Sequence, residues 1–284
     1  MRLGLSTPVV IQIPGVAAPW EAGAGADELA QIAAAADELG YEYLTCSEHV
    51  AVPTADAATR GAVYWDPLAT FGFLAAHTRR IRLATSVLVL GYHHPLEIAK
   101  RYGTLDQISG GRLVLGVGIG SLTPEFDLLG AAWPLRAARA DDAIRALRAS
   151  LSTTEPEYHG EFYDYSGMLL QPCAVQSQVP IWVGGRSTAS LNRAVGLADG
   201  WMPFGLAPAE VRTMLDAVEL PPGFEVLLST GTALDPAGDA DRTRRRLATL
   251  RAAGATAVTC VITARNAEHY CEQLATLREV ADAG

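Results

Sequence analysis

The sequence has few cysteines, and their positions exclude the roles that paired cysteines usually play. Its four cysteines are widely separated along the 284 residues and form neither a Cys-x-x-Cys motif nor another spacing typical of a metal site. These cysteines are Cys46, Cys173, Cys260 and Cys271. We interpret them as small buried side chains and expect neither disulfide bonds nor a bound metal.

Positive charge and long hydrophobic runs are scarce as well. Lysine and arginine total 22 against 31 acidic residues, which gives a formal charge of -9, and no basic run is longer than residues 244–246. This balance argues against a nucleic-acid partner. No apolar stretch reaches the roughly 18 residues of a membrane-spanning helix, and residues 1–8 lack the apolar core of a signal peptide. We therefore expect a cytoplasmic protein without a membrane partner.

The chain does contain enough apolar material for one large core. Hydrophobic residues make up 49% and charged residues 19% of the sequence, unlike the polar composition of disordered proteins. Barrels of alternating strands and helices use about 250 residues as one unit. Since no linker or low-complexity segment interrupts the chain, we expect residues 1–284 to form a single domain.

Short apolar runs alternate with helical patterns from one end of the chain to the other. The runs predict strands at residues 3–7, 41–47, 81–90, 112–118, 181–184, 200–204, 225–232 and 257–262. Helices are predicted at 27–39, 67–78, 95–110, 135–151, 188–197, 208–217, 239–253 and 266–281. Eight strand-helix pairs in order are what a closed parallel barrel requires, so the predicted fold is an α/β protein, a (β/α)8 TIM barrel.

Chemistry in such barrels takes place at the C-terminal ends of the strands. We expect the loops after the second and fourth strands, together with residues 152–180, to wall a pocket there. Within the last segment, the aromatic and glycine-centred residues 158–163 predict a small hairpin.

A carboxylate and an imidazole follow the second predicted strand, in the motif Cys46-Ser47-Glu48-His49. An imidazole at this end of a barrel can move a proton near neutral pH. Glu48 and His49 are therefore candidate catalytic residues. The alternative is a histidine that caps a helix or orders a loop.

Two strand ends, one apolar and one rich in glycine, are candidate cofactor sites. The third strand ends in an apolar run that contains Ser86 and Val87, as needed to back a flat ring, although it also fits an ordinary buried strand. Gly118 lies in the alternating glycines 116–120, which would let backbone approach a ligand closely. This pattern is not Gly-x-Gly-x-x-Gly, so a Rossmann nicotinamide site is disfavoured.

The fifth strand leads into a helix start with the elements of an anion site. Backbone N-H groups at a helix N-terminus, unobstructed by side chains and close to an arginine and hydroxyls, favour a phosphate. The residues concerned are Gly184, Gly185, Arg186 and Ser187. A plain glycine turn is the alternative interpretation.

Several other aromatic and histidine residues are candidates for the pocket wall. We interpret His77, His159 and His269 as structural and leave His93 and His94 open between loop and pocket. Aromatic pocket residues would indicate an apolar or aromatic substrate, although each also fits the core. The candidates are Trp20, Tyr64, Trp65, Tyr92, His94, Tyr163 and Trp201.

Taken together, these motifs resemble the luciferase-like flavin and deazaflavin oxidoreductases over nearly the whole chain. The motifs that carry the resemblance are Ser47-Glu48-His49, residues 81–87, 95–100, 106–112 and 116–120, Glu125-Phe126, Leu129-Gly130 and residues 180–185. The resemblance implies a flavin or coenzyme F420 across the barrel mouth, with its ring on the end of the third strand over a non-proline cis peptide bond, here Ser86 to Val87.

Site roles follow from the same resemblance. It places the cofactor phosphate around residues 184–187 and the redox centre near Glu48 and His49. A sugar-phosphate dehydrogenase of this family carries a glutamate soon after the glycines of the fourth strand, where this chain has Ser-Leu-Thr-Pro at residues 121–124. We therefore do not assign the substrate or the catalytic acid of that enzyme to this chain. The resemblance also implies a homodimer formed near the second and third units.

Three functional hypotheses remain at this point. The first is an F420-dependent oxidoreductase that moves a hydride to or from a small organic substrate. The second is an FMN-dependent monooxygenase that uses oxygen and a partner flavin reductase, with its substrate held under residues 152–180. The third is a non-catalytic barrel that binds flavin or has lost cofactor binding.

Overall fold

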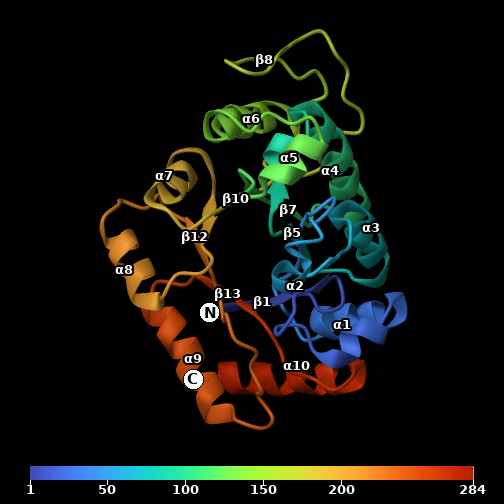
Figure 1. The fold of residues 1–284 in the computed structure, drawn as a ribbon, viewed down its shortest axis with the longest axis vertical. Coiled ribbons are helices and arrows are strands. Elements are labelled where there is room, and N and C mark those ends of the chain that lie inside the picture. The colour runs from blue at the N-terminus through green and yellow to red at the C-terminus, as the bar shows by residue number, and fades with distance from the viewer. Residues whose placement is uncertain (284) are drawn as a thin grey trace.

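The computed structural model describes residues 1–283, and its centre is a closed barrel of parallel strands (Figure 1). Each strand pairs with the next in order, and β7 pairs with β10 to close the ring. The barrel strands are β1 (Arg2–Ser6), β3 (Tyr43–Cys46), β5 (Arg82–Thr85), β7 (Leu113–Gly118), β10 (Ile181–Gly184), β11 (Gly200–Met202), β12 (Glu225–Ser229) and β13 (Ala257–Cys260). The predicted (β/α)8 barrel is therefore confirmed.

A helix follows each barrel strand, and the helices surround the strands in Figure 1. They are α1 (Ala26–Glu38), α3 (Pro67–His77), α4 (Pro95–Ser109), α6 (Arg136–Ser150), α7 (Thr188–Leu197), α8 (Pro208–Asp216), α9 (Ala240–Ala252) and α10 (Ala267–Asp282). Capping residues fix where helices begin. At the start of α3, the Asp66 carboxylate accepts a hydrogen bond from Ala69 N at 2.8 Å, and Pro67 occupies the first turn. Among the described residues, no helix is both long and apolar enough to cross a membrane.

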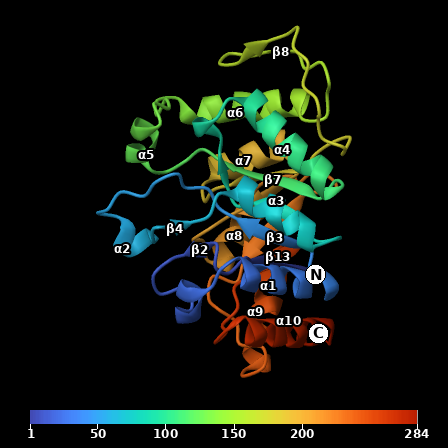
Figure 2. The same ribbon diagram turned by 90° about the vertical axis from the view of Figure 1, so that its right-hand side faces the viewer.

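Short additional elements gather at one side of the barrel. After β1, β2 (Ile11–Gln12) precedes the 3-10 helix η1 (Pro19–Gly23); after β3, α2 (Ala57–Arg60) precedes β4 (Val63–Tyr64), which pairs with β2. α5 (Thr123–Leu128) follows β7. Figure 2 shows α2, β4, β2 and α5 on the same side of the barrel strands. The site is built from the segments that carry these elements.

The third predicted strand is interrupted. β5 ends at Thr85, the Ser86–Val87 peptide bond is cis, and β6 (Leu88–Val89) then pairs with β7 before the 3-10 helix η2 (Leu90–Tyr92). The cis bond implied by the family resemblance is thus present. The expectation of one continuous strand over 81–90 is wrong, because the bulge moves β6 away from β3.

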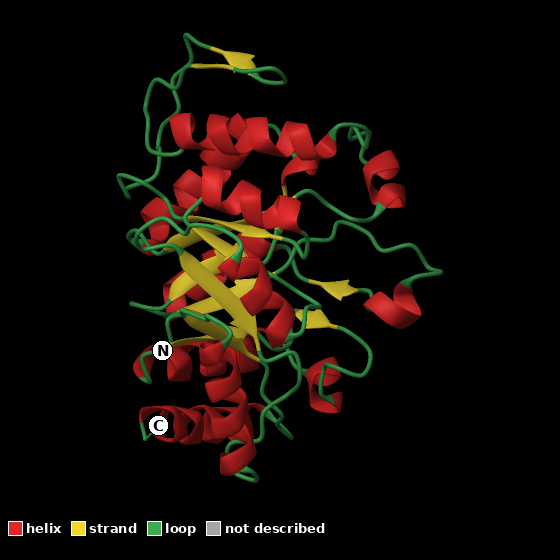
Figure 3. Ribbon diagram, turned by 90° about the vertical axis from the view of Figure 1, so that its left-hand side faces the viewer, coloured by secondary structure: helices red, strands yellow, loops and turns green. Residues whose placement is uncertain are grey.

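Residues 152–180 lie outside the barrel, and the expectation that they wall the pocket is wrong. They form the predicted hairpin, with β8 (Tyr158–His159) paired to β9 (Asp164–Tyr165), which lies beyond α6 in Figures 1 and 2 and apart from the helices in Figure 3. The Asp142 carboxylate on α6 accepts hydrogen bonds from the backbone N-H groups of Phe162 and Tyr163, at 2.7 and 3.1 Å. These bonds fix the hairpin to the outer face of the helix layer.

Large side chains fill the barrel interior beneath the mouth. Tyr43 and Trp182 are fully buried and meet edge to face, with ring centroids 5.3 Å apart. Gly4 makes room for this pair, because a Cβ there would lie 2.3 Å from the Tyr43 ring. Burial raises the pKa of Cys46 and of Cys260 to about 12, so neither thiol is ionised at neutral pH. Because the Tyr43 and Trp182 rings fill the barrel interior, a cavity for a ligand lies above them, toward the C-terminal ends of the strands.

Candidate active site

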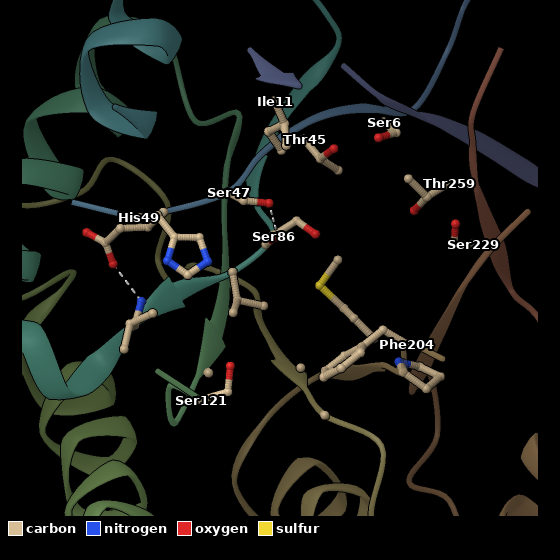
Figure 4. Close-up of a pocket in the computed structure, with 18 of the residues that line it drawn as sticks. Ser6, Ile11, Thr45, Ser47, His49, Ser86, Ser121, Phe204, Ser229 and Thr259 are labelled. Atoms are coloured by element: carbon tan, nitrogen blue, oxygen red, sulfur yellow. Dashed lines mark hydrogen bonds between the residues drawn. The ribbon is translucent and has the colours of Figure 1, made fainter. Parts of the chain in front are cut away.

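A cavity of about 860 Å³ opens at the C-terminal ends of the barrel strands. Its wall includes every residue that the sequence analysis singled out for catalysis or cofactor binding. These are Glu48, His49, Ser86, Val87, Gly118, Gly184, Gly185, Arg186 and Ser187. The barrel topology thus brings four separate strand ends together around one space (Figure 4).

The imidazole of His49 lies against a buried carboxylate. Its Nδ1 is 2.8 Å from Oε2 of Glu125 on α5, whose side chain has no exposed surface. The Tyr64 ring packs edge to face against the imidazole, with centroids 4.6 Å apart. Nε2 of His49 makes no hydrogen bond to any residue of the described chain. The imidazole is therefore held at one nitrogen and left available at the other, in a wall of the cavity.

Glu125 is ionised in this setting. Burial raises the pKa of Glu125, but hydrogen bonds from Tyr92 Oη, His49 Nδ1 and the N-H groups of Val50 and Ala51 outweigh burial and hold it below its ordinary value. A carboxylate in this position favours the His49 tautomer with the proton on Nδ1. The sequence singles out Glu125 only within the Glu125-Phe126 motif, and no spacing rule links it to His49.

Glu48 is adjacent to His49 in sequence, but its carboxylate contacts Val89 and His93. Its Oε2 accepts a hydrogen bond from Val89 N at 2.7 Å, and its Oε1 lies 2.6 Å from Nε2 of His93. Burial lowers the pKa of His93, but the hydrogen bond to Glu48 and the charges of Glu48 and Glu97 outweigh burial and raise it. Both oxygens of Glu48 thus hold β6 and the end of η2, which follow the bulge, in place.

The bulge presents the Val87 side chain between two glycines. A Cβ on Gly118 would lie 2.6 Å from Val87 Cγ2, and a Cβ on Gly184 would lie 2.7 Å from Val87 Cγ1. The glycines of β7 and β10 therefore leave space for this side chain. The Ser47 hydroxyl donates a hydrogen bond to the Ser86 carbonyl and ties the bulge to the end of β3 (Figure 4). The result is an apolar shelf with polar atoms beside it.

The turn after β10 forms a narrow cradle next to this shelf. Gly185 has φ +142°, and a Cβ there would lie 2.6 Å from Cβ of Ser190. Ser187 N donates to Ser190 Oγ at 3.1 Å, and Ser187 Oγ accepts from Ser190 N at 3.2 Å. This reciprocal cap fixes the N-terminus of α7. The exposed guanidinium of Arg186 stands beside the turn, 5.9 Å from the Phe204 ring centroid.

The far side of the cavity is rich in hydroxyls. Figure 4 shows Ser6, Ser229 and Thr259 on the side opposite His49. Thr259 Oγ1 is 2.8 Å from Tyr43 Oη, whereas the hydroxyl of Ser6 has no hydrogen-bond partner in the described chain. Glu21 also lines the cavity, and its carboxylate accepts hydrogen bonds from the backbone N-H groups of Val9 and Ala18, at 2.7 Å each.

Only some of the aromatic candidates reach the cavity. Tyr64 and Tyr92 line it, and so do Trp133 and Phe204, which the sequence analysis did not single out. The expected pocket residues that belong instead to the core or the outer layer are Trp20, Trp65, His94, Tyr163 and Trp201. Within residues 1–283, no group of three or more His, Cys, Asp or Glu side chains is arranged to hold a metal ion.

Comparison with known proteins identifies the family. Residues 1–221 match the family model of the luciferase-like monooxygenases. The uncharacterised protein Rv0940c of Mycobacterium tuberculosis is 32% identical over 200 residues, covering 66% of this chain and 69% of that protein. An F420-dependent glucose-6-phosphate dehydrogenase of Nakamurella multipartita is 33% identical over 192 residues, covering 65% of this chain and 54% of its own.

The fold agrees with this assignment. The crystal structure of the monooxygenase RslO1 from Streptomyces bottropensis superposes with a TM-score of 0.78 at 23% identity, covering 100% of this chain and 99% of that one. The chain belongs to the luciferase-like monooxygenase family, and it is an oxidoreductase.

Proposed function

We propose that the protein is a coenzyme F420-dependent oxidoreductase acting on a small organic substrate. The observation that best supports this proposal is the His49 imidazole, which is fixed at Nδ1 by Glu125 and available at Nε2 in the cavity. Moving a hydride to or from a carbon-oxygen group requires a proton to move at the oxygen as well. The Nakamurella relative, which uses F420, supports this choice of cofactor.

The residues of the cavity fit such a cofactor. The turn after β10 packs so closely on α7 that a Cβ at Gly185 would clash with Ser190, and Arg186 beside it supplies positive charge for a phosphate. The shelf of Ser86 and Val87 offers an apolar backing for a ring, with the hydroxyl of Ser47 close by. A volume of about 860 Å³ leaves room for a small substrate as well.

In the proposed mechanism, F420 supplies or accepts the hydride when bound. His49 takes a proton at Nε2 from a substrate hydroxyl, or returns one to a carbonyl oxygen, while Glu125 stabilises the positive charge that forms on the ring. Glu48 and Gly118 act on the shape of the shelf through Val89 and Val87. The neutral hydroxyls of Ser6 and Thr259 make the opposite wall suitable for an uncharged polar substrate.

The alternative is an FMN-dependent monooxygenase, which the name of the family itself favours. Such an enzyme would use the same shelf and cradle but would need oxygen and a reductase to supply reduced flavin. A substrate held under residues 152–180 is no longer part of this alternative, since that segment lies outside the cavity. A non-catalytic barrel would not require the His49–Glu125 pair.

A test of turnover separates the two enzymes. Purified protein is supplied with F420 or reduced F420 and with a panel of neutral secondary alcohols and ketones, under nitrogen and in air. We expect the absorbance of the deazaflavin to change with at least one substrate at the same rate in both atmospheres. Oxygen-dependent turnover with reduced FMN, and none with F420, would contradict the proposal.

A further inference from the structure

The cavity extends past the glycine turn to the N-terminus of α6, where a second cation stands. Trp133, Arg136 and Ala137 line this part of the wall. The guanidinium of Arg136 lies 3.7 Å from the centre of the Trp133 ring. Its Nε is buried without a hydrogen-bond partner, and within residues 1–283 no carboxylate pairs with Arg136. A guanidinium placed in this way has its charge available to a ligand in the cavity.

A neighbouring arginine fixes the position of this wall. Arg193 of α7 also lines the cavity; its Nε donates to the Asp141 carboxylate, and its Nη2 donates to the Ala137 carbonyl at 3.3 Å. The ion pair with Asp141 neutralises Arg193 and joins the start of α6 to the first turns of α7. Among the described residues, Arg136 and Arg186 are therefore the two arginines of this part of the cavity wall that no carboxylate pairs with.

The charge distribution around the cavity is one-sided. Ser6, Ser229 and Thr259, on the wall opposite His49, carry neutral hydroxyls, and the Glu21 carboxylate of the cavity wall is held by two backbone N-H groups. A single phosphate on the turn after β10 would meet Arg186, which leaves Arg136 without a counter-charge. Two separate guanidinium groups suit a ligand that carries two separate anionic groups.

We infer that Arg136, stacked on Trp133, forms a second anion subsite that binds a carboxylate of the cofactor tail beyond its phosphate. This inference rests on the proposed function. F420 carries a phosphodiester followed by glutamyl carboxylates, whereas FMN carries all its charge on one terminal phosphate. The subsite therefore favours F420 over FMN through charge, away from the ring where the two cofactors are similar.

The chain offers a matched control for this subsite. Arg139 lies one turn further along α6, stacks on Phe162 of the outer hairpin at 4.5 Å, and also has a buried Nε without a partner. It does not line the cavity. The experiment compares wild type, Arg136→Gln and Arg139→Gln by isothermal titration calorimetry with F420, with the deazaflavin riboside that lacks phosphate and tail, and with FMN.

We expect Arg136→Gln to weaken F420 binding about tenfold or more, while its affinities for the riboside and FMN stay within about twofold, because a charge-assisted contact is lost. Arg139→Gln should bind all three ligands like wild type. Equal losses for F420 and the riboside, an equal loss in Arg139→Gln, or no loss at all would overturn the subsite alone. Failure of the wild type to bind F420 would overturn the proposed function and the subsite with it.

Discussion

Replacing Glu125 by glutamine tests the role of the buried carboxylate without changing its size. Glu125 Oε2 contacts His49 Nδ1 at 2.8 Å and accepts from Tyr92 Oη at 2.7 Å, while Oε1 accepts from the backbone N-H groups of Val50 and Ala51. Glutamine has one acceptor oxygen, so it cannot serve both sets of donors. It also removes the negative charge that stabilises a protonated imidazole.

The magnitude follows from these contacts. A hydrogen bond to a charged group contributes about 1.5 to 3 kcal/mol, and about 1.4 kcal/mol corresponds to a factor of ten. We therefore expect Glu125→Gln to lower the single-turnover rate of hydride transfer about 10- to 100-fold. The loss is expected because the positive charge that forms on the His49 ring when it takes a proton no longer faces a carboxylate. Cofactor affinity should stay within a few-fold.

The assay is a stopped-flow measurement of deazaflavin absorbance at a fixed pH, with thermal unfolding of each variant in parallel. Tyr92→Phe is the matched control, since it removes a hydrogen bond from the same carboxylate oxygen but leaves the pair with His49 intact. Its rate should fall much less than the rate of Glu125→Gln. An unchanged rate in Glu125→Gln, or an equal loss of rate in both variants, would refute the positioning role.

Three further predictions concern individual residues of the site and its support. His49→Ala should lower turnover strongly while cofactor affinity changes by less than a few-fold; an unchanged rate would remove His49 from the mechanism. Gly185→Val should weaken cofactor binding, since a Cβ there would lie 2.6 Å from Ser190 Cβ in a backbone conformation that side chains disfavour; the control Gly196→Ala in α7 has open space and should bind normally in the same titration. The raised pKa of His93 means that its ion pair stabilises the fold below the ordinary pKa of 6.5, and that this contribution is lost as pH rises through the folded-state pKa. Urea unfolding should therefore show His93→Gln to be less stable than wild type at pH 6, with a difference that shrinks toward alkaline pH; a constant difference would contradict this account.

Periodicity was enough to predict the barrel, because a buried parallel strand and an amphipathic helix leave different patterns in the sequence. The capping residue Asp66 and the first-turn Pro67 marked a helix start in the same way. The break at Ser86 and Val87 could not be read from the sequence, since the branched residues on both sides continue without interruption. The family resemblance alone implied it.

The candidate site was predictable in its location more than in its contacts. Strand ends define the mouth of a barrel, and residues such as His49 and Gly185 lie there because of their position along the chain. The hydrogen-bond partner of His49 could not be predicted from the sequence, because Glu125 lies 76 positions further along the chain and is brought to His49 by α5. Glu48, the carboxylate next to His49 in sequence, bonds instead to Val89 and His93.

The binding of the cofactor tests the central claim most directly. Ligand-free protein is titrated side by side with F420 and with FMN, following the fluorescence of its tryptophans, of which Trp133 lines the cavity. We predict tight binding of F420 and weak binding of FMN. The reverse preference, or binding of neither cofactor, would contradict the assignment of an F420-dependent oxidoreductase.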